Sequence, residues 1–223
     1  MKESNLGLMM KIDSYLNCGF FACFTIAIFE NSESASFECK YDFYAYETVG
    51  NIYYCWIQNN LKINSPSSAL ITSHSGGHKS GYNNNYVYGI WSDVGGISYF
   101  PLGLDELYPN INFIVIRKGR IQELHQSDLK SLPNLKHLDL GQNDIDVLEE
   151  GLFDYNLELV LISFMENKIC EVAQSSFDIM PKLHWLYLSY NQCKEVYDAR
   201  TTFEALNLLV EDVRMNQCNC SDY

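Results

Sequence analysis

The sequence has few basic residues, with 15 Lys and Arg against 28 Asp and Glu, and its formal net charge is −13. The basic residues form no stripe, so we expect no nucleic acid partner, because nucleic-acid-binding domains concentrate Lys and Arg on one face. An acidic surface is also a poor match for an anionic membrane face. The charge balance therefore argues against both of these polyanionic partners.

Signatures of catalysis and of cofactor binding are also missing from the sequence. It contains no Gly-x-Ser-x-Gly elbow and no cysteine in a catalytic signature. The segment 76–80 has Gly, Lys and Ser but lacks the spacing and the strand-to-helix context of a phosphate loop. His74 and His78 are four residues apart, but no further Cys, His or Asp ligand is close in sequence. We therefore expect no enzyme, no metal and no cofactor.

What the sequence does contain is one interval that recurs. Five positions lie 24 residues apart, and a sixth follows 25 residues later: Gly95, Gly119, Asn143, Asn167, Asn191 and Asn216. The same apolar frame surrounds each, most clearly in Leu135-x-x-Leu138-x-Leu140-x-x-Asn143-x-Ile145-x-x-Leu148. This frame is that of the leucine-rich repeat, whose period is about 20–29 residues.

The frame predicts a short strand followed by a turn in each repeat. Side chains alternate across a strand, so Leu138 and Leu140 should point into the core, while His137 and Asp139 should point outward. The asparagine follows the strand, and its amide can bond to neighbouring backbone groups there. Stacked asparagines should therefore form a ladder that satisfies the backbone of the turns.

The predicted fold class is α/β, a leucine-rich repeat solenoid (horseshoe) with a parallel concave sheet. One repeat cannot bury its own apolar edge, so neighbouring repeats must stack. We place the repeats in residues 87–217, with the firm copies in 111–203. The terminal copies are degenerate, as expected where one side of a repeat has no neighbour.

The N-terminus resembles a signal peptide, which we place at residues 1–36. Lys11 precedes an apolar run, Leu16–Phe29, and small polar residues follow it, so cleavage is expected near Ser36–Phe37. The alternative is a signal anchor, but the run is short of the about 20 apolar residues that span a bilayer. No second hydrophobic span follows, so we expect a secreted, extracellular chain with no stable membrane insertion after cleavage.

Six cysteines remain after the leader, an even number that favours disulfides in a secreted chain. Cys39 and Cys55 flank a tyrosine-rich stretch, and we expect them to staple a β-hairpin that caps the solenoid. This N-terminal cap and its connecting loops occupy residues 37–86.

At the other end, Cys193 and Cys218 occupy the same frame position in adjacent repeats, so they should stack within bonding reach. The pairing of Cys170 and Cys220 stays open, and a free thiol at Cys170 is an equal alternative. The tail, residues 218–223, has the Cys-x-Cys start of a truncated cysteine cap. It also places Asn219 in a formal glycosylation acceptor.

The outward positions of the strands form the candidate partner-binding site on the concave face. Large apolar groups stand at several of these positions, and exposed Trp and Tyr are favoured anchors of partner sites. The alternative is that the N-terminal cap or a neighbouring loop folds over them. The candidate residues are Trp91, Phe113, Val115, Arg117, His137, Asp139, Leu161, Met165, Trp185 and Tyr187.

The 104–203 stretch looks like extracellular leucine-rich repeat proteins, and the mature chain resembles the small secreted members of dipteran insects. The resemblance rests on the hairpin cap Cys39…Tyr53-Tyr54-Cys55, the glycine-bounded loop 76–81 and the step Phe100-Pro101. It implies a secreted horseshoe that recognises proteins or surface glycoconjugates, in innate immunity or in matrix. It implies no chemistry.

The predicted function is protein recognition through the concave face, in innate immunity or extracellular signalling. Two alternatives stay open: a structural or matrix component that self-associates, and the truncated ectodomain of a longer receptor-like protein with leucine-rich repeats. The sequence does not fix the oligomeric state.

Overall fold

A computed structural model describes residues 35–46, 50–58, 61–172, 176–177, 179–192 and 209–210 of the chain. The chain divides into two compact units, Met1–Asn31 and Ser32–Tyr223, and every described residue belongs to the second. None of the helices in this described part has the length and hydropathy needed to cross a bilayer.

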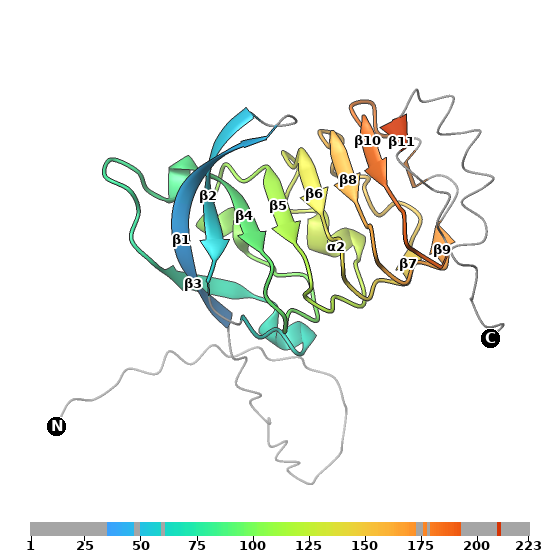
Figure 1. Ribbon diagram of the computed structural model, residues 1–223, viewed down its shortest axis with the longest axis horizontal. Coiled ribbons are helices and arrows are strands. Elements are labelled where there is room, and N and C mark those ends of the chain that lie inside the picture. Colours follow the sequence, from blue (N-terminus) through green and yellow to red (C-terminus); the bar gives the residue numbers. More distant parts are fainter. Residues whose placement is uncertain are drawn as a thin grey trace, which may run out of the picture. The chain divides into compact units, whose positions relative to one another are not determined.

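Most strands of the second unit form one nine-stranded sheet, in the order β11-β10-β8-β6-β5-β4-β2-β1-β3 (Figure 1). One parallel strand comes from each repeat, and equivalent positions pair across the sheet, as in Phe113↔His137 and Leu161↔Trp185. The predicted parallel sheet is confirmed. Its repeat strands are β4 (Val87–Ser92), β5 (Phe113–Ile116), β6 (His137–Asp139), β8 (Leu161–Ser163), β10 (Trp185–Tyr187) and β11 (Leu209–Val210).

The hydrophobic core lies between this sheet and the segments that return to the next strand. The inward leucines Leu138 and Leu140 are fully buried there, together with Ile145 and Leu148 from the return segment, as the frame predicted. The return segments contain short elements: α1 (Leu104–Leu107), α2 (Gln126–Leu129), and the paired strands β7 (Val147–Leu148) and β9 (Glu171–Val172). Two 3-10 turns, Pro66–Ser68 and Asn84–Tyr86, precede β4, the first repeat strand.

The N-terminal cap is an antiparallel hairpin of β1 (Ala35–Tyr46) and β2 (Gly50–Ile57). A disulfide joins Cys39 and Cys55 across it, with 5.1 Å between the Cα atoms, so the predicted staple is confirmed. The hairpin continues the solenoid sheet, because β2 pairs in parallel with β4, and β3 (Ile71–Ser75) pairs in parallel with β1. β1 starts at Ala35, two residues before the expected start of the mature chain.

The asparagine ladder is also present. The Asn143 Oδ1 accepts hydrogen bonds from the N–H groups of Gly119, Arg120 and Ile121 at 3.0–3.1 Å, and its Nδ2 donates to the Leu140 carbonyl at 2.9 Å. Each asparagine thus joins its own turn to that of the preceding repeat. Gly119 holds the ladder position of its repeat, where a Cβ would lie 2.9 Å from Asn143 Oδ1.

A regular feature that the sequence did not reveal stands beside the ladder. The residue just before each of the four ladder positions from Gly119 to Asn191 has a positive φ of 55–60° although it is not glycine. These left-handed residues turn the chain out of their four strands, and they form a row along one edge of the sheet. They are Lys118, Gln142, Glu166 and Tyr190.

Candidate partner-binding surface

The front face of the sheet, defined as the side opposite the core, carries all ten predicted site residues. Five of them were expected to be exposed and are only 0–4% exposed, so that expectation was wrong: Phe113, Val115, His137, Asp139 and Leu161. The other five are partly exposed: Trp91, Arg117, Met165, Trp185 and Tyr187.

The cap hairpin explains the burial around Phe113. At the end of the hairpin where Tyr46 pairs with Gly50, the Tyr46 ring packs against Phe113 and His137, with centroid distances of 5.5 and 4.6 Å. Ile52 joins Phe113 and Val115 in a small cluster separate from the main core. The alternative in which the cap folds over the strands therefore holds for this part of the face.

A glycine in β4 makes this packing possible. Gly89 holds the front position next to Phe113, and a Cβ there would lie 2.9 Å from Phe113 Cδ1 and 3.0 Å from Ile52 Cδ1. Because real Cβ atoms do not approach so closely, any side chain at this position would displace the hairpin or the Phe113 ring. Because Gly89 has no side chain, Ile52 of the cap can pack against Phe113 at this position, which we call the seat of the hairpin.

Burial changes the chemistry of His137. Its ring stacks on Phe113 at 4.4 Å, and burial lowers its pKa to about 4, a shift that Asp139 opposes and Arg117 reinforces. At neutral pH the imidazole is therefore uncharged and serves as a packing group rather than as an exposed contact.

Asp139 can be buried because its carboxylate forms an ion pair with Arg117. Both Nε, at 3.0 Å, and Nη2 of Arg117 donate to Asp139 Oδ2, while the Gly141 N–H donates to Oδ1 at 2.9 Å. The guanidinium also lies 5.9 Å from the centre of the Trp91 ring. The ion pair therefore holds two charged groups in fixed positions in the middle of the front face.

A pocket of about 270 Å³ opens beside this ion pair. Tyr46 from the hairpin and Tyr187 from β10 contribute to its wall, and Leu161 and Met165 add apolar surface. Its polar lining comes from Arg117, Asp139, Gly141, Gln142, Ser163 and Glu166. Five of the predicted site residues thus meet in one place.

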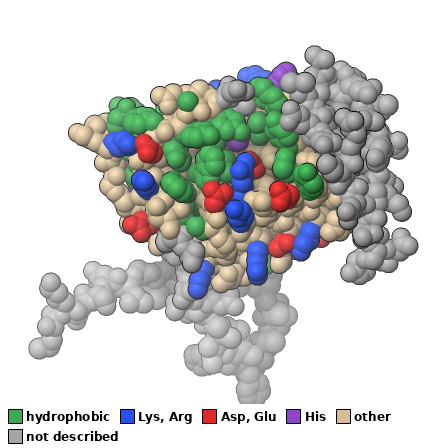
Figure 2. Space-filling view, viewed as in Figure 1, with side chains coloured by type: hydrophobic (Ala, Val, Ile, Leu, Met, Phe, Trp, Pro, Cys, Tyr) green, Lys and Arg blue, Asp and Glu red, His purple; other side chains and the backbone are tan. Residues whose placement is uncertain are grey.

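The hairpin adds aromatic residues that the sequence analysis missed. Tyr44 lies 5.4 Å and Tyr54 6.4 Å from Trp91 between ring centroids, and Trp56 pairs with Trp91 across the strands. Alternation along the tyrosine-rich stretch could have shown that every second residue faces the front. Figure 2 shows hydrophobic side chains gathered in a band across one face of the molecule, with charged side chains beside it.

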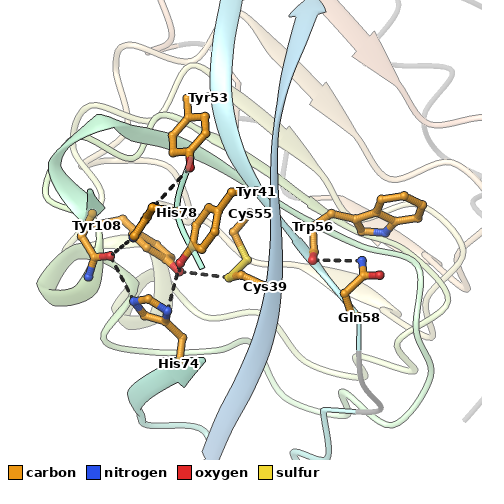
Figure 3. The surroundings of a disulfide bond; sticks show 10 residues. Cys39, Tyr41, Tyr53, Cys55, Trp56, Gln58, His74, His78 and Tyr108 are labelled. Atoms are coloured by element: carbon orange, nitrogen blue, oxygen red, sulfur yellow. Dashed lines mark hydrogen bonds between the residues drawn. A yellow bond between two sulfur atoms is a disulfide. The ribbon is translucent and has the colours of Figure 1, made fainter. Parts of the chain in front are cut away.

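The opposite side of the hairpin holds a hydrogen-bonded cluster around the disulfide (Figure 3). The Tyr41 hydroxyl bonds to His74 Nδ1 at 2.9 Å and to the Tyr108 hydroxyl at 3.1 Å. Asn84 Oδ1 accepts from Nε2 of both His74 and His78, at 3.1 and 2.8 Å. Burial raises the pKa of Tyr41 to about 12 and raises that of Tyr108 as well. His74 therefore links Asn84 to Tyr41 of the cap hairpin, and His78 bonds to the same asparagine.

The remaining predicted sites concern the C-terminal part of the chain. Cys193, Cys218 and Asn219 lie outside the described residues, so their disulfide and glycosylation stay predictions. Cys170 is disulfide-bonded, which rules out the free thiol, and its partner is not among the described cysteines.

The family profile described as Leucine rich repeat matches residues 109–169. Mouse Toll-like receptor 9 is 29% identical over 121 residues, covering 54% of this chain and 12% of the receptor. Pig fibromodulin is 31% identical over 121 residues, covering 54% of this chain and 80% of that sequence. Mouse mimecan is 29% identical over 97 residues, covering 44% of this chain and 31% of mimecan. The chain thus spans less than a third of the receptor and of mimecan.

Among solved structures, a chain of the Drosophila Toll–Spätzle complex in its glycosylated form superposes with a TM-score of 0.50. The sequence identity is 17%, and the match covers 72% of this chain and 23% of that chain. This likeness shows the solenoid fold alone.

Proposed function

Because the chain belongs to the leucine-rich repeat family, we propose that it is an extracellular protein-recognition module whose binding surface is the front face of the sheet. The role is binding rather than catalysis. The solved complex of Toll with Spätzle is an example in which a protein of this fold associates with a protein ligand.

The observation that carries this proposal is that one face of the sheet has exposed aromatic groups above a well-packed layer of buried side chains. Tyr44 and Trp56 are 36% and 41% exposed, Trp91 beside them is partly exposed, and Tyr187 is partly exposed farther along the same face in β10. Tyr and Trp dominate the energetics of protein interfaces because they bring large contact areas with few rotatable bonds. The buried hairpin contacts beneath them hold the surface in place before binding, which lowers the entropy lost on association.

Secretion is part of the proposal. The Cys39–Cys55 disulfide suits an oxidising compartment, where such bonds persist. Ala35 and Ser36 already pair with Ile71 and Ser73 of β3, so cleavage just before Ala35 would leave β1 whole. N-terminal sequencing of the chain from the medium of secreting insect cells tests this proposal, and a mature protein that starts at Met1 would contradict it.

The binding proposal is tested by affinity capture from the extracellular fluid of the source organism. The bait is the immobilised chain, compared with a variant in which Trp56 and Trp91 are both replaced by alanine. We expect a protein that the native chain retains and the variant loses, while a Tyr155→Ala bait still retains it. Equal retention by the native and doubly substituted baits would place the binding surface elsewhere. Loss of the signal after deglycosylation of the fluid would identify a glycoconjugate instead.

A further inference from the structure

The pocket on the front face has the size of a site for one side chain. Its volume of about 270 Å³ falls just below the roughly 300–1,000 Å³ typical of small-molecule sites. Tyr46 and Tyr187, which line it, come from the hairpin and from the C-terminal part of the sheet. Such a pocket fits a single anchor residue that projects from a bound polypeptide.

The charges of the pocket favour a cation. Arg117 and Asp139 neutralise each other, and both Asp139 oxygens already accept hydrogen bonds. Glu166 is exposed, accepts a hydrogen bond from Gln142 Nε2 at 3.0 Å, and has no cationic partner among the described residues. The pocket therefore carries one carboxylate that its own residues leave unbalanced.

Glu166 is also held in position before any ligand arrives. Its backbone N–H donates to the Ser189 carbonyl at 3.0 Å, and the Gln142 N–H donates to the Met165 carbonyl at 2.8 Å. Glu166 and Gln142 both have the left-handed conformation that recurs at this point of four successive repeats. The carboxylate thus stands on a fixed backbone at the pocket edge, which reduces the entropy lost when it pairs.

The aromatic lining points to the same ligand charge. The faces of tyrosine rings carry negative potential, so Tyr46 and Tyr187 attract a cation placed between them. Arg117 already shares its charge with the buried Asp139 through Nε and Nη2, so an anion at its remaining N–H groups would meet a largely neutralised guanidinium beside the Glu166 carboxylate. The pocket therefore favours basic anchors over acidic ones.

We propose that the pocket binds a basic side chain of the protein ligand, with arginine preferred over lysine because a planar guanidinium can stack on a tyrosine ring while it pairs with Glu166. This inference rests on the proposed function of the front face, which it makes specific. It also fits the net charge of −13, which favours a basic partner in the encounter.

The test uses the full mature chain and a small probe, N-acetyl-L-arginine amide, so it does not require the natural ligand. Met165 lines the pocket, and Met180 is buried in the core, so their labelled methyl groups report binding and fold integrity separately in NMR spectra. We expect a saturable shift of the Met165 methyl with the arginine probe. The near-isosteric but neutral N-acetyl-L-citrulline amide should give little shift.

Variants sharpen the test. Glu166→Gln should weaken the arginine probe about threefold, as for one exposed ion pair, whereas Glu106→Gln, an exposed carboxylate in α1, should leave its affinity unchanged. Tyr46→Leu should weaken the probe while the Met180 signal keeps its position. An immobile Met165 signal, or equal responses to arginine and citrulline, would overturn the cation pocket. Front-face dependence in the capture experiment would then still support the proposed function.

Discussion

Tyr46, in the cap hairpin, packs edge-on against His137 of a central repeat, with 4.6 Å between their ring centroids. The contact joins residues from β1 and β6, which are four places apart in the order of the sheet. The cap therefore does more than close the end of the core, because it also shapes the front face and supplies one side of its pocket. Stability of the cap and ligand binding should consequently respond to the same substitutions.

The seat of the hairpin can be tested at Gly89. Gly89→Ala places a Cβ within 3.0 Å of both Phe113 and Ile52, and we expect overpacking to destabilise the fold by about 1–3 kcal/mol. Urea unfolding measures the change. Gly77→Ala is the matched control, because a Cβ at Gly77 would have no atom within 4 Å and its φ is not positive. Equal midpoints for the two variants would contradict the tight seat.

Stability should depend on pH through His137. Its pKa is about 4 in the folded chain against about 6.5 when exposed, so the unfolded chain binds more protons between these values. The folded state is thus most favoured above pH 6.5, and it loses about 3 kcal/mol as the pH falls to 4. Among the described residues, the groups that act on the imidazole include Tyr46, Phe113, Arg117 and Asp139.

The measurement compares unfolding free energies at several pH values for the native chain and for His137→Gln. The variant should show a flatter profile between pH 6.5 and 4, because its amide does not titrate. A native chain that is equally stable across this interval would show that His137 is accessible to protons in the folded state.

Asp139 should be a stability residue, contrary to what its outward strand position suggested. Leu140→Ala should destabilise by about 2–5 kcal/mol through lost core packing. Asp139→Ala removes the acceptor of the Arg117 guanidinium and of the Gly141 N–H, and we expect a loss of about 1–3 kcal/mol rather than a negligible one. In a double-mutant cycle with Arg117→Met, the two losses should not add. Additive losses would mean that the ion pair contributes nothing.

The ladder should be sensitive at each asparagine. The Asn167 Oδ1 accepts from the Ile145 N–H at 3.1 Å, and its Nδ2 donates to the Leu140 and Phe164 carbonyls at 2.9 and 3.0 Å. Asn167→Ala leaves these buried backbone groups without partners, so we expect a loss of at least about 2 kcal/mol. Thermal unfolding checks it against Asn134→Ala, an exposed asparagine. A similar Tm for both variants would refute the role of the ladder.

The sequence predicted those parts of the fold that repeat or that are local. A period of 24 residues fixes the inward leucines, the parallel strands and the ladder, because each repeat reproduces the same contacts. The Cys39–Cys55 hairpin was predictable because its two strands are adjacent in sequence.

The docking of the hairpin over the face was not predictable in the same way. It depends on Gly89, Ile52 and Phe113 meeting from three different strands, and no periodicity encodes such a contact. Strand alternation correctly placed His137 and Asp139 away from the core, but it could not show that Tyr46 and Arg117 would cover them. Strand alternation therefore placed the candidate residues on the side of the sheet away from the core, but it assigned exposure to several that are buried.

The front face itself is tested by Trp56, which pairs with Trp91 across the strands and points away from the cluster around Tyr41 (Figure 3). A central aromatic anchor typically contributes about 2 kcal/mol or more to binding, so Trp56→Ala should lower the affinity for a captured protein ligand at least about 30-fold. The matched control is Tyr155→Ala, because Tyr155 is 43% exposed against 41% for Trp56 and lies outside the sheet, over Lys130.

Binding of the captured ligand to each purified variant is measured by calorimetry or surface plasmon resonance, alongside the unfolding midpoint. The aromatic ring of Trp56 contributes little to the core, so its removal should change affinity far more than stability. Tyr187→Ala should weaken binding as well, since Tyr187 borders the pocket on the opposite side from the hairpin. If both variants bind as tightly as the Tyr155 control, the ligand does not use the front face. A variant that binds weakly only because it is unfolded would show a lowered midpoint, so the two measurements together separate recognition from folding.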